Sequence, residues 1–483
     1  MRARHAVTTT FGVAATVALT LGCRKSPDAK APDAKAPDAQ PPARAAAAHA
    51  APVDTLTHPA WSRRAVIYEV NVRQFTPEGT LRAIQPHLAR LKSLGVDVIW
   101  LMPVQPIGRK NRKGPMGSYY SISDYTAINP ELGTMADFDA LVAAAHREGL
   151  KVLLDWVPNH TAFDHPWITQ HPDWYVRKAD GTIINARDNE GHDTDWTDVA
   201  ELNYDDAALR RAMIDAMRWW LEHGKVDGFR CDVAGGVPLD FWMQARADLL
   251  KVRPDLFMLA EAEDPRLHAA FDMTYGWEFH HLLNEVAQGK KPAPALDAYL
   301  ARQDSVFGRD AYRLYFTSNH DENSWNGSEF ERMGANAQPA FVLASTLRGS
   351  MPLLYTGQEV SLRKRLRFFE KDTVDWKGPS LAPFYHALFD LKHTHRALAN
   401  GAEGGDQVTL HTDAGPKVYA FVRSRGDDAV LVALNFGDAP VTAAYRDLRT
   451  PGTFTDWFSR GKVALSPAGT IAIPAHGYRV LVH

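Results

Sequence analysis

The sequence predicts an α/β fold in which a (β/α)8 barrel carries a small subdomain after its third strand and is followed by an antiparallel β-domain. Three observations support this prediction. Short apolar runs alternate with helical patterns from residue 61 to about residue 399, which is typical of strand–helix units around a parallel sheet. The connection after the third run is too long for a plain loop. Near residue 400 the helical pattern gives way to short alternating strands.

The overall composition is that of a soluble globular enzyme. The chain has 483 residues, of which 45% are hydrophobic and 23% are charged, and a chain of this length can bury a large core. Its 54 Lys and Arg residues against 57 Asp and Glu residues give a formal charge of -3. We expect no nucleic-acid partner, because this balance provides no basic field to hold phosphates. The two cysteines, Cys23 and Cys231, are too few for a disulfide scaffold.

The first 56 residues are expected to be an export signal and a tether. Arg2 and Arg4 precede an uncharged stretch of small and apolar residues, so residues 1–22 are predicted to be a signal peptide. The run Leu-Thr-Leu-Gly before Cys23 resembles a bacterial lipoprotein cleavage box. Residues 23–56 repeat Ala-Pro-Asp-Ala-Lys and hold few large apolar side chains, which predicts a lipidation site followed by a disordered, extended spacer.

This N-terminus predicts an exported protein. We expect a membrane partner through a lipid anchor on Cys23, as in an outer-membrane or cell-surface lipoprotein. The alternative is ordinary signal cleavage near Ala48, which would release a soluble secreted protein.

The first strand–helix unit begins after Trp61. Residues 65–72 form an apolar β-type run, and leucine and isoleucine recur at helical spacing from residue 81 to residue 94. Gly95 closes this helix, and residues 96–102 are almost continuously apolar, as expected for a strand that is covered on both faces.

The same alternation continues along the chain. Helices are predicted at residues 135–147, 207–222 and 240–252, and further strands at residues 151–157, 227–232, 256–260, 271–275, 312–318 and 352–356. With the first two strands this makes eight, which suits a closed barrel domain over residues 57–399. The functional loops of such a barrel lie at the carboxyl ends of its strands.

Two segments depart from the barrel pattern. Residues 161–201 are rich in Trp, His and Asp and are predicted to form the inserted subdomain, which would wall one side of a cleft. Residues 400–483 are predicted to form the C-terminal β-domain, with strands at 408–411, 418–423, 430–435, 440–444 and 470–482.

Charged side chains gather where the predicted barrel strands end. Four carboxylates have an arginine and two histidines beside them: Asp155, Asp232, Glu261 and Asp321, with Arg230, His160 and His320. A carboxylate that ends a buried strand is costly unless it is solvated, paired or functional. A single one could be structural, but four at one barrel mouth indicate proton transfer, nucleophilic attack by a carboxylate, or a metal site.

Motifs in one order along the chain resemble the alpha-amylase superfamily of glycoside hydrolases, from about residue 61 to residue 483. They are GVDVIWLMP (95–103), YSISDYTAINPELGT (120–134), DWVPNH (155–160), AELN (200–203), GFRCDVA (228–234), the strand end at Glu261, SNHDEN (318–323), GSMPLLYTGQE (349–359) and DTVDW (372–376). The resemblance implies a catalytic TIM barrel, a small subdomain after the third strand and a C-terminal β-sandwich.

The resemblance also implies three catalytic roles. Asp232 corresponds to the nucleophile, Glu261 to the general acid/base, and Asp321 to the acid that holds the sugar hydroxyls and distorts the ring. Cleavage with retention needs one ionised and one protonated carboxyl roughly 5 Å apart. Arg230 lies two residues before Asp232, on the same side of the strand, and would keep it ionised. Glu263 has the same parity as Glu261 and is the alternative acid.

Further site residues follow from the same motifs. His160 and His320 resemble the pair that binds the hydroxyls of the cleaved sugar, and Tyr120 resembles the aromatic platform beneath it. The alternative for Tyr120 is a plain core residue, because Tyr119 beside it is equally aromatic. Asp155 is expected to pair with Arg230. Cys231 should point to the barrel–helix layer as a small core residue.

The resemblance implies a structural Ca²⁺ between the barrel and the inserted subdomain, and no organic cofactor. Asn159 and Glu201 match two ligand positions, and a backbone carbonyl near Gly236 matches a third. Glu201 stands where the family usually has Asp, but a longer carboxylate is still a hard oxygen donor. The basic clusters at residues 109–113 and 363–367 are expected to be solvated loops.

The expected activity is retaining, endo-type hydrolysis of α-1,4-glucosidic bonds in starch, glycogen or maltooligosaccharides, by a protein that is expected to be a monomer. An oligosaccharide-specific α-glucosidase, a maltogenic enzyme or an α-glucanotransferase would use the same triad and stays an alternative. The remaining alternative is a non-catalytic glucan-binding protein, which would be expected to lose a triad member.

Overall fold

The computed structural model describes residues 56–483. The predicted signal peptide, Cys23 and all but the last residue of the predicted tether lie outside this part of the chain. Within residues 56–483, no helix has the length and apolar character needed to cross a membrane.

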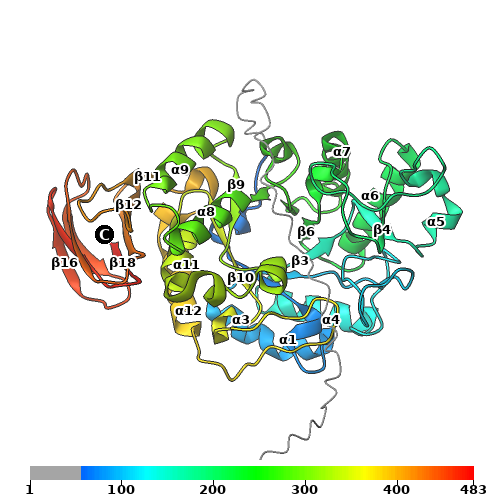
Figure 1. Ribbon diagram of the computed structural model, residues 1–483, viewed down its shortest axis with the longest axis horizontal. Coiled ribbons are helices and arrows are strands. Elements are labelled where there is room, and N and C mark those ends of the chain that lie inside the picture. The colour runs from blue at the N-terminus through cyan, green and yellow to red at the C-terminus, as the bar shows by residue number, and fades with distance from the viewer. Residues whose placement is uncertain (1–55) are drawn as a thin grey trace, which may run out of the picture. The chain divides into compact units, whose positions relative to one another are not determined.

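Eight parallel strands close into a barrel, as predicted (Figure 1). In chain order they are β1 (Ile67–Val70), β2 (Val98–Leu101), β3 (Lys151–Trp156), β6 (Gly228–Cys231), β7 (Phe257–Ala260), β8 (Met273–Tyr275), β9 (Tyr312–Tyr315) and β10 (Ser350–Tyr355). Neighbouring strands follow one another around the barrel in this order, and β1 pairs with β10 to close it.

Alternate residues of each strand point into the barrel or toward the helices. Trp100, Leu153 and Leu259 belong to the buried cluster inside the barrel. Leu154 and Cys231 belong to the larger cluster between strands and helices. The predicted orientation of Cys231 is therefore confirmed.

The helices cover the outside of the barrel. The longer ones are α3 (Leu88–Leu94), α4 (Met135–Arg147), α6 (Ala207–Glu222), α7 (Leu239–Leu249), α8 (Trp277–Ala287), α9 (Ala295–Val306), α11 (Ala337–Thr346) and α12 (Ala382–Thr394). The helix predicted from residue 81 to residue 94 is divided: α2 (Leu81–Ile84) is followed by a 3-10 turn at Gln85–His87 before α3. Pro86 explains the break, because it lacks an amide hydrogen for the helical ladder.

The inserted subdomain is anchored by two short antiparallel strands. β4 (His160–Ala162) directly follows the end of β3, and β5 (Val199–Glu201) returns beside it, which places His160 opposite Glu201. Between them lie α5 (Trp167–Gln170) and a 3-10 turn at Pro172–Trp174. Both ends of the insertion therefore meet next to the carboxyl end of β3.

The C-terminal domain is antiparallel, as predicted, and consists of a six-stranded and a two-stranded sheet. The strands of the larger sheet lie in the order β11 (Asp406–Thr409), β12 (Val418–Arg425), β13 (Asp428–Asn435), β18 (Gly477–Val482), β15 (Gly452–Asp456) and β16 (Lys462–Leu465). In the smaller sheet, β14 (Val441–Tyr445) pairs with β17 (Gly469–Ile473). The single strand predicted at 470–482 is wrong, because the chain turns after Ile473 and forms β17 and β18. The prediction also missed β15 and β16, which hold few large apolar residues.

Candidate active site

Arg230 is the centre of a buried cluster of carboxylates at the mouth of the barrel. Its guanidinium lies 3.0 Å from Asp155, 2.9 Å from Asp232 and 2.8 Å from Glu261, measured between nitrogen and oxygen atoms. Asp155 lies in β3, Arg230 lies in β6, and Asp232 and Glu261 directly follow β6 and β7. The carboxyl ends of parallel barrel strands meet at one mouth, which is why residues far apart in sequence converge here. The predicted pairing of Asp155 with Arg230 is confirmed.

Asp232 and Glu261, the two central carboxyl groups, have different pKa values. It raises the pKa of Glu261 to about 8; the Arg230 charge opposes this effect, while the charges of Asp232 and Asp321 add to it. Burial also raises the pKa of Asp232, to about 6, with Arg230 and a hydrogen bond from Glu261 holding it lower. At neutral pH Glu261 is therefore protonated and Asp232 is mostly ionised. Arg230 limits the rise for Asp232, but it does not bring that pKa down to the ordinary value.

The turn after β6 holds Glu261 in place. The backbone amide of Val233 donates a hydrogen bond of 3.0 Å to Glu261 Oε2. Val233 has a φ of 45°, in the left-handed region that β-branched residues rarely adopt. Strain of this kind persists only where the surrounding structure enforces it, and it is typical of functional sites. No residue pattern signals this contact, because it is made by a backbone atom.

His320 carries a positive charge at the barrel mouth. Its Nδ1 lies 2.5 Å from Glu69 Oε1, and its Nε2 lies 3.2 Å from Asp321 Oδ2. Burial lowers the pKa of His320, but Asp321 and Glu69 outweigh that effect and raise the pKa to about 9. Glu69 lies in β1 and was not among the predicted site residues. A signal for it was present, since a glutamate inside an apolar strand is costly unless it is paired.

Tyr120 lies within the site, and its neighbour Tyr119 lies behind it. The Tyr120 hydroxyl donates to Asp155 Oδ2 at 3.1 Å and lies 2.7 Å from His320 Nε2, and its ring stacks on the imidazole with centroids 5.3 Å apart. Tyr119 instead donates to Asn71 and lies under the Arg73 guanidinium. Of the two adjacent tyrosines, only Tyr120 therefore contacts the cluster.

His160 and Glu263 differ in their relation to the cluster. His160 begins β4 and is hydrogen-bonded to the backbone of Tyr120, and burial lowers its pKa to about 4, so it is neutral at pH 7. Glu263 accepts a hydrogen bond from the Glu278 amide at 2.7 Å and pairs with Arg313. That pair lies outside the barrel wall, because Arg313 alternates with the inward-facing residues of β9. The inward orientation expected for Glu263 is therefore wrong.

The predicted calcium ligands lie near one another at the base of the inserted subdomain. A Cβ atom built on Gly236 would lie 2.8 Å from Asn159 Nδ2 and 3.3 Å from the Asp188 carbonyl oxygen, so these groups converge, while Asn159 Oδ1 lies 3.0 Å from His160 Nδ1. Glu201 has one buried carboxylate oxygen without a hydrogen-bond partner, while the other lies 3.6 Å from Arg187 Nη1. A side-chain amide can turn over to present its oxygen. With the Asn159 amide turned in this way, the Asp188 carbonyl and the Glu201 carboxylate, which has an unsatisfied oxygen, complete a donor set that fits a hard cation.

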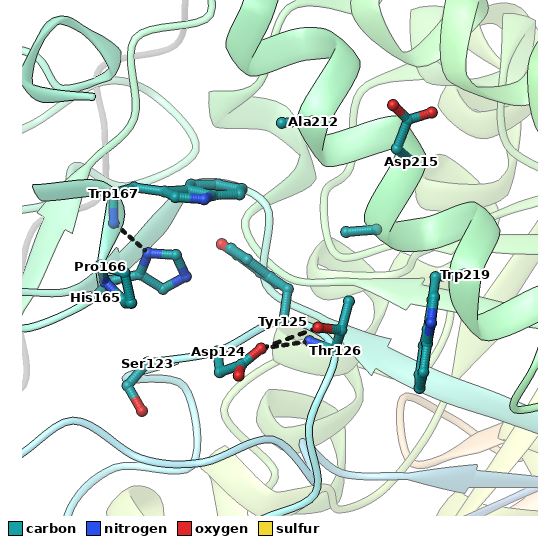
Figure 2. A pocket seen from close by; sticks show the side chains of 11 residues that line it. Ser123, Asp124, Tyr125, Thr126, His165, Pro166, Trp167, Ala212, Asp215 and Trp219 are labelled. Atoms are coloured by element: carbon teal, nitrogen blue, oxygen red, sulfur yellow. Dashed lines mark hydrogen bonds between the residues drawn. The ribbon is translucent and has the colours of Figure 1, made fainter. Parts of the chain in front are cut away.

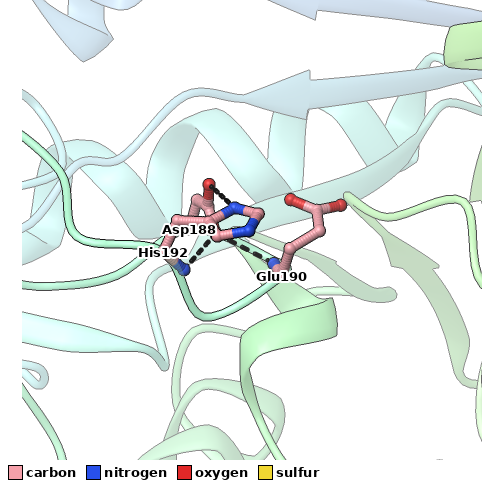
Figure 3. Close-up of side chains that lie close together, drawn as sticks. All are labelled: Asp188, Glu190 and His192. Carbon is pink, nitrogen blue, oxygen red and sulfur yellow. Dashed lines mark hydrogen bonds and ion pairs between the residues drawn. The ribbon is translucent and has the colours of Figure 1, made fainter. Parts of the chain in front are cut away.

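The side chain of Asp188 is hydrogen-bonded within its own turn. It accepts hydrogen bonds from the Glu190 and His192 amides at 3.0 and 2.8 Å, and its other oxygen lies 3.1 Å from His192 Nδ1 (Figure 3). The carboxylate of Asp188 therefore closes a surface turn, and only its backbone carbonyl faces Gly236.

Two surface hollows lie apart from the carboxylate cluster. One, of about 380 Å³, is lined by Tyr125, Trp167 and Trp219, with the two tryptophans on opposite sides of the tyrosine (Figure 2). The other, of about 620 Å³, is lined by Arg90, Trp376 and residues of α12. Neither hollow is lined by Arg230 or by the carboxylates around it, so the candidate active site is marked by its convergent charged side chains.

Comparisons with known proteins match both parts of the chain. The family model described as the alpha amylase catalytic domain matches residues 54–378, and the model of the alpha amylase C-terminal all-beta domain matches residues 409–480. Alpha-amylase MalA of Haloarcula japonica is 34% identical over 403 residues, which cover 80% of this chain and 57% of that protein. Alpha-1,4-glucan:maltose-1-phosphate maltosyltransferase 2 of Streptomyces coelicolor is 28% identical over 415 residues, covering 79% of this chain and 60% of that protein.

Two solved structures are similar over nearly their whole length. The maltogenic alpha-amylase AmyB of Thermotoga neapolitana has a TM-score of 0.78 at 28% identity, with 87% of this chain and 98% of that chain covered. An alpha-amylase of Lactobacillus plantarum has a TM-score of 0.78 at 30% identity, with 88% and 99% covered. By contrast, the chain spans less than two thirds of the length of the two curated relatives above.

Proposed function

The chain belongs to the alpha-amylase family, and on that premise we propose that it hydrolyses α-1,4-glucosidic bonds of starch, glycogen or maltooligosaccharides by an endo-acting, retaining mechanism. One observation carries the proposal. The carboxyl groups of Asp232 and Glu261 lie 2.9 and 2.8 Å from the Arg230 guanidinium, and burial raises the pKa of Glu261 above that of Asp232, so Glu261 keeps its proton at a pH at which Asp232 has lost its own. This is the pair of protonation states that retaining cleavage requires.

The first step forms a covalent intermediate. Asp232 attacks the anomeric carbon while Glu261 donates its proton to the leaving glycosidic oxygen, so that the bond breaks without release of an alkoxide. Arg230 holds both carboxyl groups in position. The positively charged His320 and the partly exposed Asp321 face the hydroxyls of the cleaved sugar, and Tyr120 lies beneath its apolar face.

The second step reverses the role of Glu261. Once Asp232 is esterified, its negative charge is gone, and that charge is one of the groups that raise the pKa of Glu261. The pKa of Glu261 therefore falls, and the carboxylate that has just lost its proton stays ionised. It can then act as the base that removes a proton from the attacking water.

Transfer to a sugar instead of water is the second candidate function. A relative named as a maltosyltransferase supports it, and the same carboxyl pair would form the same intermediate. Incubation with starch and with a reducing-end-labelled maltooligosaccharide separates the candidates. Internal fragments of many lengths support endo hydrolysis, a single short product from one end supports exo action, and labelled products longer than the substrate support transfer. No turnover of either substrate would contradict both proposals.

We propose further that Asn159 and Glu201, with the Asp188 carbonyl, hold a structural Ca²⁺. The unsatisfied oxygen of Glu201 supports this proposal. When bound, the ion would supply positive charge that ties the end of β3 to the inserted subdomain, and it would take no part in bond cleavage.

A further inference from the structure

A row of aromatic side chains extends outward from Tyr120 along the rim of the barrel. The Phe368 ring is nearly parallel to that of Tyr120, at 17° and 6.3 Å between centroids. Trp325 packs on Phe368 at 5.2 Å and on Phe369 at 5.8 Å. Trp325 is 46% exposed, although it is a large apolar side chain and follows Asp321 by only four residues.

The backbone under this row is fixed by hydrogen bonds between two loops. Trp325 lies in a π-helical turn, Glu322–Asn326, after β9, and Phe368 lies in the loop after β10. The Asn323 amide donates to the Lys364 carbonyl at 3.1 Å, and its carbonyl oxygen accepts from the Leu366 amide at 2.8 Å. The turn that carries the exposed Trp325 indole is therefore held in place by hydrogen bonds to the neighbouring loop. The basic side chains of residues 363–367 are exposed, as expected for a solvated loop, while the backbone of this loop holds Asn323.

The strand order separates the aromatic row from Glu261. Trp325, Phe368 and Tyr120 follow strands β9, β10 and β2, which lie side by side around the barrel with β1 between the last two. Glu261 follows β7, which lies opposite β1 across the barrel and is separated from β9 by β8, and it protonates the oxygen of the leaving group under the proposed mechanism. Under that mechanism the leaving sugar would lie toward Glu261, and the row, which continues outward from Tyr120, would face the part of the glucan that stays with the enzyme.

We propose that Trp325, backed by Phe368, is a stacking platform for the glucose unit next to the cleaved one on its non-reducing side. The proposal rests on the proposed function and adds a donor-side subsite to it. The C–H face of a pyranose is apolar and stacks on an indole, while its hydroxyls remain in solvent. A substrate that reaches Trp325 gains this contact, and a substrate with a single sugar does not.

The test compares a long with a one-sugar substrate in four forms of the full-length enzyme: wild type, Trp325→Ala, Trp325→Phe and Met243→Ala. Met243 is a matched control, because it is an apolar residue on α7 that is 51% exposed. For Trp325→Ala, kcat/KM on maltoheptaose should fall about fivefold to tenfold, whereas kcat/KM on α-glucosyl fluoride should stay within twofold. Trp325→Phe should recover most of the loss, and Met243→Ala should change neither substrate.

Each outcome has a separate meaning. Equal losses on both substrates would show that Trp325 only supports the fold, and unchanged kinetics on both would show that it does not contact sugar; either result overturns the platform. A wild-type enzyme that turns over neither substrate would instead overturn the proposed function. In that case the platform is tested by measuring the Kd of wild type and of Trp325→Ala for maltoheptaose and for glucose. The substitution should weaken binding of maltoheptaose and leave binding of glucose unchanged.

Discussion

Glu69 Oε1 lies 2.5 Å from Nδ1 of His320, and both side chains are buried. Burial raises the pKa of Glu69 while the His320 charge lowers it, and the pKa of His320 is raised to about 9. The other nitrogen of His320 faces Tyr120 and Asp321. Glu69 thus keeps the imidazole charged and oriented without facing the sugar itself.

Replacing Glu69 by Gln should lower the pKa of His320 and destabilise the protein. A raised histidine pKa contributes stability that is fully present below pH 6.5 and is lost as the pH rises through about 9. At pH 6 the variant should therefore be less stable by about 1–3 kcal/mol, and at pH 10 the difference should be smaller. Urea unfolding at both pH values measures this change. An unchanged His320 titration by NMR in the variant would contradict the proposed coupling.

Replacing Glu261 by Gln should slow the enzyme according to how much the leaving group needs a proton. Cleavage of starch should fall by about 10²–10⁴, while the first step with α-glucosyl fluoride should keep much of its rate, because fluoride leaves with little help. Asp232→Asn should abolish both reactions, since an amide cannot attack the anomeric carbon. Added azide should relieve the block in Glu261→Gln at the second step.

Glu263→Gln is the matched control for that experiment. It removes a carboxyl two residues from Glu261 that pairs with Arg313 outside the barrel wall, so it should show no dependence on the leaving group. If Glu263→Gln shows that dependence and Glu261→Gln is nearly silent, the acid has been misassigned.

The pH profile of kcat/KM should be bell-shaped. Activity should rise through about pH 6 as Asp232 loses its proton and fall through about pH 8 as Glu261 loses its own. Initial rates on a maltooligosaccharide from pH 4 to pH 10 measure both limbs. With α-glucosyl fluoride the first step should lack the alkaline limb, because fluoride departure depends little on the acid. An optimum below pH 5 would conflict with the burial of both groups.

Removal of calcium should lower the melting temperature. Binding of an ion to the folded state alone stabilises it by about 2.7 kcal/mol at a hundred times Kd, so EDTA should produce a shift that added Ca²⁺ reverses. Glu201→Gln should melt lower and should respond to neither reagent. Glu148→Gln is the control, because Glu148 is an exposed carboxyl at the end of α4 and lies outside the inserted subdomain. A wild type whose melting temperature is unaffected by EDTA and Ca²⁺ would refute the proposed site.

Replacing Cys23 by Ser should move the protein from the membrane fraction to the soluble exported fraction. Cys23 lies outside the described residues, so this prediction depends on the cleavage-box resemblance alone. Stable anchoring needs more than one acyl chain, and all of them would be lost with the cysteine. Fractionation followed by immunoblotting measures the shift. Wild-type protein that is entirely soluble outside the cell would contradict the anchor.

The strand pattern predicted most of the fold and much of the site. Buried parallel strands are continuous apolar runs, so their ends could be located, and carboxylates such as Asp232 and Glu261 stand at those ends. The contacts that were missed have other sources. The amide of Val233 and the carbonyl of Asp188 belong to the backbone, which carries no residue signature. Trp325 meets Phe368 only because two loops come together in three dimensions.

The left-handed backbone of Val233 limits how the enzyme can adapt to heat. A glycine there would relieve the strain, but it would leave a cavity where the buried Val233 side chain packs, and it would free the peptide whose amide locates the proton donor. Lineages under selection for durability at high temperature would therefore gain little from relaxing this turn. They should instead accumulate stabilising changes in surface loops and helices far from the barrel mouth.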